Sequence, residues 1–273
     1  PGDTMPTGTS MIEKGEPDIA PELWTNGLGP LLKPAVEEGR IASAGESIAG
    51  GAIESLWIPK YMLDAHPELA TIDGVIANPQ LFPDPEDPSK GALYGCPAGW
   101  NCQITTHQLF KAGDMANKGW NLIDPGSGAG LAGSMSEAYN KGDGWIGYYW
   151  GPTAILGQVE MVQVDQGPCD AAEWERCIGI DMDCPDPVMM NHPVSTVEIY
   201  VSKKIMDNDT VMTYLGNRGM TSAEISVLLA AADADQLSPE EAAEYILENR
   251  SDLWTRMVSD EAAEKIKQSL IFD

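Results

Sequence analysis

The sequence predicts an α/β protein made of two lobes joined by a hinge. Strand-like runs alternate with helical segments over the first two-thirds of the chain, which is typical of α/β architecture. The passages at residues 71–85 and 191–195 would let the chain leave one lobe and return to it. We therefore expect lobe I to consist of residues 1–72 and 193–273, and lobe II of residues 73–192. The spacing of the predicted elements alone is also compatible with architectures other than two hinged lobes.

The predicted elements begin with a helix over 9–14 and a strand over 18–24. Apolar side chains three or four residues apart predict a helix over 55–66 that ends at Pro67. The passage 78–99 is rich in Pro, Asp and Gly, which predicts extended chain and turns. Further elements are expected as helices over 103–115 and 135–141 and as strands over 121–124, 144–150, 159–164 and 194–201.

The C-terminal third is predicted to be helical. Thr221 with Glu224, and Ser238 with Glu241, form capping-box pairs, in which each side chain bonds the other residue's backbone amide. A third helix is expected from about Ser259.

The chain is strongly acidic, with 16 basic and 42 acidic residues and a net charge of −26. Such a protein repels polyphosphate backbones and anionic lipid surfaces, so we expect no nucleic-acid partner. No apolar run approaches the ~20 residues that a membrane-spanning helix needs. We expect the protein to act as a monomer.

Five cysteines fall into two groups, one of Cys96 and Cys102 and one of Cys169, Cys177 and Cys184. Close pairs in loop-like sequence favour local disulfides and an oxidising compartment, such as the periplasm. Zinc would need Cys-x-x-Cys spacing or nearby His, and neither is present. Cys177–Cys184 is the favoured pair of the second group, and pairings through Cys169 stay open. No signal peptide is visible in the sequence.

The segment from Gly95 to Cys102 is the most specific stretch of the sequence. A disulfide between Cys96 and Cys102 would close a small ring, and Pro and Gly inside it let the backbone turn. The ring would hold Trp100 rigidly beside the amides of Asn101 and Cys102, and rigid amides suit an oxyanion or carboxylate. The alternative is a disulfide that only staples a surface loop.

Eight Trp against three Phe is an unusual aromatic balance, and Trp is favoured where a ring face meets a cation. Trp24 and Trp150 each end a predicted strand, where open α/β sheets bind ligands. Glu22 lies two residues before Trp24 on the same strand face and would supply a countercharge or point to solvent. Without further information, each Trp is more often a core residue than the wall of a cation site.

Four segments together resemble the substrate-binding proteins of glycine betaine, proline betaine and choline ABC importers. They are Pro-Glu-Leu-Trp24, the Gly-Trp-Asn between Cys96 and Cys102, Tyr-Tyr-Trp150, and His192-Pro-Val-Ser-Thr196. The resemblance implies a hinged, two-lobed periplasmic-binding-protein fold of type II, with the ligand between the lobes and an ABC permease as partner. It also implies that Trp24, Trp100 and Trp150 form a cage for a trimethylammonium group. The amides of Asn101 and Cys102 would then receive the ligand's carboxylate.

The sequence departs from that family in two places. Betaine-specific relatives with this Cys loop have a His where this chain has Leu28, so one partner for a carboxylate is missing. Choline, trimethylamine N-oxide and sulfonium compounds therefore stay open beside glycine betaine. Family members also have two strands and a helix before the segment that begins here at Pro1, so we expect the native chain to be longer.

Weaker signals include a loop with Asp84, Glu86 and Asp87, which would hold Ca²⁺ or simply be solvated. The glycine cluster at 126–133 is interpreted as a turn before a helix, and His192 as structural.

No hydrolase, zinc-protease or phosphate-loop motif is present, so we expect no catalysis and no required cofactor. The alternative function is an enzyme or sensor subunit on the same fold, acting on a methylated amine or sulfonium compound.

Overall fold

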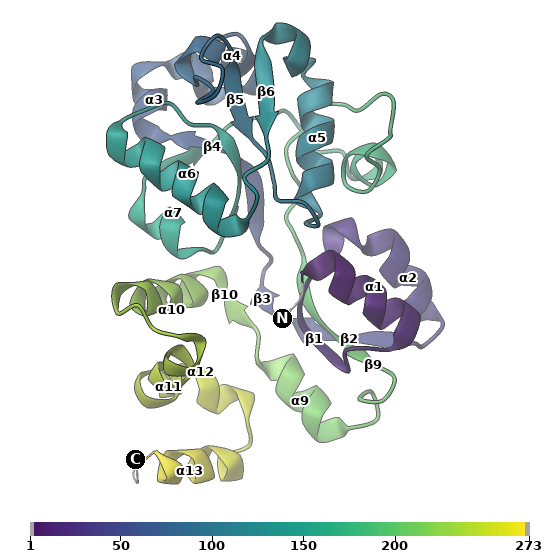
Figure 1. Cartoon of the computed structure of the whole chain (residues 1–273). Helices are drawn as coiled ribbons and strands as arrows, with labels where there is room; N and C mark the ends of the chain where they lie inside the picture. Colours follow the sequence, from purple (N-terminus) through teal and green to yellow (C-terminus); the bar gives the residue numbers. More distant parts are fainter. Residues whose placement is uncertain (1–2, 271–273) are drawn as a thin grey trace.

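The computed structural model describes residues 3–270, which form two α/β lobes (Figure 1). The sheet of lobe II has five strands, and β4 runs antiparallel to both of its neighbours, while β5 is parallel to β6 and β7. Its strands, in spatial order, are β6 (Trp120–Ile123), β5 (Gly91–Tyr94), β7 (Gly147–Gly151), β4 (Ile53–Pro59) and β8 (Met161–Gln163). Helices surround this sheet: α3 (Lys60–Ala65), α4 (Ile72–Ile76), α5 (Cys102–Ala112), α6 (Gly128–Lys141) and α7 (Ala154–Gln158).

Lobe I contains a smaller sheet of three antiparallel strands. The strand β9 (Val197–Ser202) lies between β1 (Ile19–Trp24) and β2 (Ile41–Glu46). The helices α1 (Thr4–Lys14) and α2 (Gly29–Glu37) share a core with this sheet. The expectation that further strands precede residue 1 stays a prediction.

The C-terminal part is helical, as predicted: α9 (Asp209–Asn217), α10 (Ser222–Ala234), α11 (Pro239–Asn249), α12 (Ser251–Trp254) and α13 (Asp260–Ser269). Both capping boxes are formed, at Thr221 with Glu224 and at Ser238 with Glu241. Ser259 caps α13 by accepting the amide of Ala262. None of the helices over residues 3–270 is both long and apolar enough to cross a bilayer.

Two segments cross between the lobes side by side. The backbones of Ala52 and Ser195 pair there, with reciprocal N–H···O distances of 2.8 and 3.0 Å. Next to this pair, β3 (Ile48–Ala49) pairs in parallel with β10 (Met220–Thr221). The bridge between Ala52 and Ser195 joins the two segments where they pass between the lobes, so we interpret it as the hinge.

The first crossing lies earlier than the sequence suggested. We expected lobe I to continue to residue 72, but β4 pairs with β7 and β8 and therefore belongs to the sheet of lobe II from Ile53 onward. The helix predicted over 55–66 is wrong over its first half for the same reason. Its apolar residues Leu56 and Ile58 are two apart and point to the core of lobe II, at 1% and 0% exposure. Only α3 in the second half of that segment is helical.

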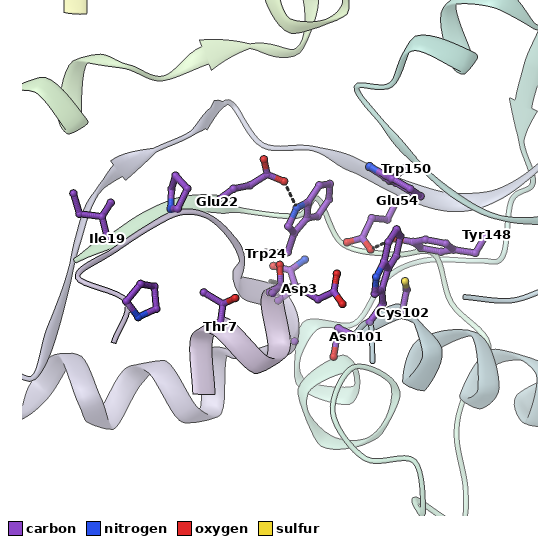
Figure 2. Close-up of a pocket in the computed structure, with 16 residues that line it drawn as sticks. Asp3, Thr7, Ile19, Glu22, Trp24, Glu54, Asn101, Cys102, Tyr148 and Trp150 are labelled. Atoms are coloured by element: carbon purple, nitrogen blue, oxygen red, sulfur yellow. Dashed lines mark hydrogen bonds between the residues drawn. The ribbon is translucent and has the colours of Figure 1, made fainter. Parts of the chain in front are cut away.

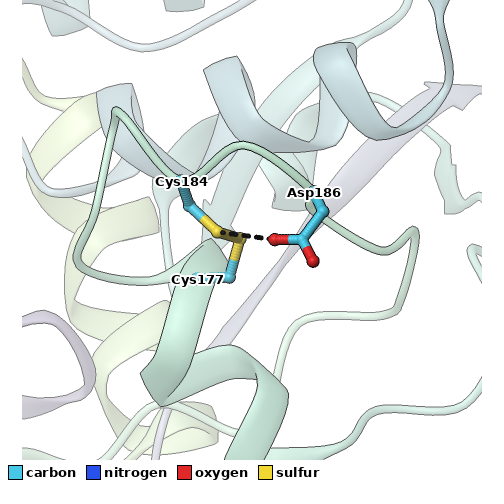
Figure 3. Close-up of side chains that lie close together, drawn as sticks. All are labelled: Cys177, Cys184 and Asp186. Atoms are coloured by element: carbon cyan, nitrogen blue, oxygen red, sulfur yellow. Dashed lines mark hydrogen bonds between the residues drawn. A yellow bond between two sulfur atoms is a disulfide. The ribbon is translucent and has the colours of Figure 1, made fainter.

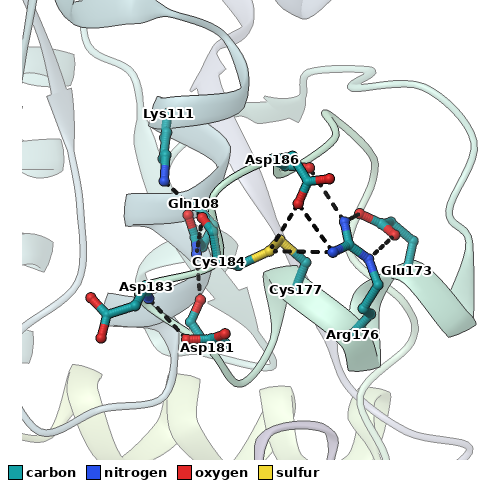
Figure 4. Close-up of a disulfide and its surroundings, with 9 residues drawn as sticks. All are labelled: Gln108, Lys111, Glu173, Arg176, Cys177, Asp181, Asp183, Cys184 and Asp186. Atoms are coloured by element: carbon teal, nitrogen blue, oxygen red, sulfur yellow. Dashed lines mark hydrogen bonds and ion pairs between the residues drawn. A yellow bond between two sulfur atoms is a disulfide. The ribbon is translucent and has the colours of Figure 1, made fainter.

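Two disulfides are present, Cys96–Cys102 and Cys177–Cys184, and Cys169 is exposed and unpaired. The second disulfide begins at Cys177, inside a π-helical turn over Trp174–Ile178 that follows α8 (Ala171–Glu173). Gln108 and Lys111 of α5 donate to backbone carbonyls of this loop, and Arg176 bonds Glu173 and Asp186 beside the sulfurs (Figure 4). These hydrogen bonds hold the loop on α5 of lobe II.

Candidate ligand-binding site

A cavity of about 650 Å³ lies between the two lobes (Figure 2). Lobe I contributes residues from α1, β1 and the turn that follows β1, and lobe II contributes the start of β4, the end of β7 and the start of α5. All six residues that the sequence predicted as ligand-binding line it: Glu22, Trp24, Trp100, Asn101, Cys102 and Trp150. The further lining residues are Asp3, Thr4, Thr7, Pro17, Ile19, Pro21, Asn26, Gly27, Glu54 and Tyr148.

The three tryptophans of the cavity differ from the other five. Trp24, Trp100 and Trp150 are half-buried and turn part of their surface to the cavity. Four others are 5% exposed or less, namely Trp120, Trp145, Trp174 and Trp254, and Trp57 packs against the lobe II core. Trp57 is half-buried as well, so contact with the cavity, rather than burial, distinguishes Trp24, Trp100 and Trp150.

Trp100 and Trp150 form a corner of the cavity. Their ring centroids are 5.1 Å apart and their planes are inclined by 77°, an edge-to-face contact. Trp150 is further stacked on Tyr149, at 4.6 Å and 26°. Trp24 reaches the same cavity from lobe I, so the aromatic walls come from both lobes.

The position of Trp24 is fixed by Glu22. The indole Nε1–H donates to Glu22 Oε1 at 2.9 Å, which is the local bond expected for residues two apart on one strand face (Figure 2). Glu22 is exposed, so its carboxylate both faces the cavity opening and orients the ring. Its role as a countercharge to a bound cation stays a prediction.

The disulfide loop holds Trp100 against lobe II. Cys96 and Cys102 are buried at 3% and 5% exposure, and α5 begins at Cys102. The Trp100 ring lies so close to Gly128 that a Cβ there would come within 2.9 Å of it. The first amides of a helix have no partner within the helix, so those of Asn101 and Cys102 are available to a ligand oxygen.

The lobes touch at Asn101 and Gly27. A Cβ built on Gly27 would lie 2.0 Å from the Asn101 side chain, so a larger residue at this position would force Asn101 to move. Next to it, Leu28 is 0% exposed and packs against Gly8 in the core of lobe I. Leu28, where the resemblance implies a His in betaine-specific relatives, is therefore turned away from the cavity in this structure.

Glu54 is a cavity residue that the sequence reasoning missed. Its carboxylate accepts hydrogen bonds from the hydroxyls of Ser195 and Tyr148. Burial raises the pKa of Glu54, and the two hydrogen bonds oppose that rise. The acid next to the apolar residues of Ile53–Pro59 was the available signal, but the prediction of a helix over 55–66 concealed the strand that carries Glu54 into the cavity.

The residues of the predicted calcium loop are not gathered as ligands. Asp84 is 2% exposed, and its oxygens accept the amides of Glu86 and Asp87 and the side chain of Asn121. Asp84 therefore shapes the turn. The only close group of potential ligands in residues 3–270 is Cys177, Cys184 and Asp186 (Figure 3), where both sulfurs are in a disulfide and offer no thiolate.

His192 lies in the core beside the cavity wall. Both of its ring nitrogens are buried without a hydrogen-bond partner, and its ring centroid is 5.9 Å from that of Tyr148 and 5.1 Å from that of Trp174. Burial lowers the pKa of His192 to about 3, so the ring is neutral near pH 7.

Comparison with known proteins assigns the chain to a family. The profile described as "Substrate binding domain of ABC-type glycine betaine transport system" matches residues 1–249, most of the chain. The chain belongs to this family. It is a substrate-binding protein of a betaine/choline-type ABC transporter, a class of extracytoplasmic, non-enzymatic proteins.

Solved structures of glycine betaine and choline binding proteins share the fold. A glycine betaine/L-proline-binding protein (ProX) from Borrelia burgdorferi matches with a TM-score of 0.71 and 13% identity, over 97% of this chain and 86% of that chain. A choline-binding protein in complex with choline matches with a TM-score of 0.70 and 15% identity, over 97% and 85%. Lactococcal OpuAC, closed on glycine betaine, matches with a TM-score of 0.65 and 13% identity, over 94% and 86%. These likenesses confirm the two-lobed periplasmic-binding-protein fold.

Proposed function

We propose that this protein captures a small methylated onium compound between its lobes and delivers it to the permease of its ABC importer. The observation that carries the proposal is the set of three half-exposed tryptophans, Trp24, Trp100 and Trp150, around one cavity. A trimethylated nitrogen has no N–H to donate, so aromatic faces are its natural partners, each worth ~0.5–2 kcal/mol. Three such faces account for a few kcal/mol of binding.

The charge of the cavity favours a ligand without a carboxylate, such as choline or trimethylamine N-oxide, over glycine betaine. Within the described chain, the cavity is lined by three carboxylic acids, Asp3, Glu22 and Glu54, and by no Lys, Arg or His. A ligand carboxylate would be repelled by them. The hydroxyl of choline can instead donate to Glu54, and an N-oxide oxygen can accept from the amides of Asn101 and Cys102.

Ligand capture is proposed to accompany closure of the lobes. Trp24 belongs to lobe I, whereas Trp100 and Trp150 belong to lobe II, so a cation meets all three only when the lobes approach each other. The paired segments at Ala52 and Ser195 are the points about which such a hinge motion would turn. Closure would also join the lobe surfaces that face the permease.

A binding panel tests this proposal. Thermal shift and isothermal titration would be measured with choline, trimethylamine N-oxide, glycine betaine, proline betaine, carnitine and dimethylsulfoniopropionate. We expect choline or trimethylamine N-oxide to raise the melting temperature most and glycine betaine to bind more weakly. No shift with any methylated compound would contradict the proposed function, and tightest binding of glycine betaine would contradict the argument from charge.

A further inference from the structure

Glu54 is connected to lobe I by a chain of hydrogen bonds through the hinge. Asn26, in the turn after β1, donates its Nδ2 to Ser195 Oγ at 3.1 Å and to the Val194 carbonyl at 3.1 Å. Ser195 lies on the returning segment, is 0% exposed, and donates its hydroxyl to Glu54 Oε2. Tyr148 of β7 donates to the other oxygen, Oε1.

The order of these groups fixes the direction of each bond. The Ser195 hydroxyl has a single hydrogen, and the Asn26 amide can only donate at Nδ2. Because Ser195 Oγ accepts from Asn26, its hydrogen is free to point at Glu54. The Tyr148 hydroxyl likewise donates its one hydrogen to Glu54. Both oxygens of the carboxyl therefore act as acceptors, the arrangement that suits the ionised form.

We propose that Ser195, oriented by Asn26, is a positioning residue that holds Glu54 as a hydrogen-bond acceptor and thereby sets the cavity's preference for a positively charged ligand. This rests on the proposed function, which it deepens by naming what selects the charge of the ligand. Ser195 pairs with Ala52 at the hinge, so the bond to Glu54 also depends on how the lobes are placed.

Burial of Glu54 opposes ionisation of its carboxyl group, and the hydrogen bonds from Ser195 and Tyr148 favour it. Burial raises the pKa of Glu54, and the bonds from Ser195 and Tyr148 are the influences that lower it. The ionisable residues that lobe I contributes to the cavity are the acids Asp3 and Glu22, and neither supplies a positive charge that would favour ionised Glu54. His192, behind Tyr148, is kept neutral by burial, which lowers its pKa to about 3.

The first arm of the test needs no ligand. The side-chain carboxyl ¹³C resonance of Glu54, identified by its loss in Glu54→Gln, would be followed from pH 4 to 9 in the whole chain. Losing one hydrogen bond to the charged form should raise the midpoint in Ser195→Ala by about one to two pH units. Asn26→Ala should shift it in the same direction by less. Tyr148→Phe removes the other donor and should also raise the Glu54 midpoint. This variant provides the same test if Ser195→Ala does not fold.

A matched control is present in lobe I. Ser43 donates its hydroxyl to Glu198 at 2.8 Å, the same pair of residue types outside the cavity. Ser43→Ala should leave the Glu54 midpoint at the wild-type value. An unshifted midpoint in Ser195→Ala and Tyr148→Phe, with melting temperatures that show folded protein, would overturn the proposal.

The second arm uses tetramethylammonium, a cation with no polar end. Its affinity for the wild type should fall as the pH drops through the Glu54 midpoint, and this fall should begin at higher pH in Ser195→Ala. Glu54→Gln should give a flat profile. A wild-type profile retained in Glu54→Gln would overturn the role of Glu54 in charge selection. If tetramethylammonium does not bind at any pH while the midpoint still shifts in the first arm, the proposed function fails and the link from Ser195 to Glu54 stands.

Discussion

Trp100 and Trp150 meet edge to face, with ring centroids 5.1 Å apart and planes inclined by 77°. One ring comes from the disulfide loop before α5 and the other from the end of β7, so two elements of lobe II hold each other in place. Such an edge-to-face pair contributes ~0.5–1.5 kcal/mol beyond its buried area. The corner is thus formed within one lobe, and only Trp24 has to arrive from the other.

Removal of a cavity tryptophan should weaken binding without a matching loss of stability. Trp24→Ala and Trp100→Ala are each expected to lower ligand affinity at least about tenfold, because a cation–π face and its apolar contact are lost. Isothermal titration measures the effect. Trp254→Phe is the control, since Trp254 is 5% exposed in the C-terminal helices and donates to the Leu247 carbonyl. It should reduce stability and leave affinity unchanged, and equal affinities of all three variants would exclude the cage.

Two replacements of Glu22 separate its two roles. Glu22→Gln keeps an oxygen that can accept from the Trp24 indole but removes the charge, whereas Glu22→Ala removes both. If Glu22 mainly orients Trp24, Glu22→Gln should bind within about twofold of the wild type and Glu22→Ala about fivefold more weakly, consistent with one exposed hydrogen bond. Equal losses in the two variants would instead make Glu22 a countercharge.

The two disulfides form a matched pair for testing preorganisation. They span sequence separations of 6 and 7, and only Cys96–Cys102 borders the cavity. Cys96→Ala with Cys102→Ala, and Cys177→Ala with Cys184→Ala, should each reduce the free energy of unfolding by about 2 kcal/mol, from chain entropy alone. Only the first double variant should also lose affinity, by roughly fivefold, because the Trp100 loop is no longer preorganised. The same affinity loss in both would point to a general loosening of lobe II.

The buried neutral His192 should make stability fall in mild acid. Its pKa is lowered to about 3, whereas an unfolded His titrates near 6.5, so between these values the unfolded chain binds more protons. Stability is therefore lost as the pH falls from 6.5 toward 3, by about 2 kcal/mol at pH 5 from this residue. Urea unfolding at pH 7 and pH 5 should show a smaller loss in His192→Phe than in the wild type. His66→Asn, which changes an exposed ring, is the control, and equal pH dependence of His192→Phe and wild type would contradict the assignment.

The site could be predicted from sequence where local chemistry determines it. Trp24, Trp100 and Trp150 stand in short motifs whose turns, strand ends and cysteines fix their surroundings, and the helix caps at Thr221 and Ser238 are local as well. Glu54 could not be predicted, because its partners Ser195 and Tyr148 are 141 and 94 residues away in the sequence.

The same physical reason explains the misplaced lobe boundary. Spacing in Ser55–His66 fits a helix, but the pairing of β4 with β7 and β8 adds backbone hydrogen bonds that the local pattern does not contain. Tertiary pairing decided the outcome for β4, and with it the face that Glu54 presents to the cavity.

The most direct test of a cation-binding cage compares the best ligand of the panel with its uncharged carbon isostere. The pairs are choline with 3,3-dimethylbutan-1-ol, and trimethylamine N-oxide with tert-butanol. Shape is nearly constant within a pair, and the positive charge on the central atom is lost. From three aromatic faces we predict that isothermal titration gives the isostere an affinity lower by about thirtyfold or more. Equal affinities of the two compounds would contradict the account.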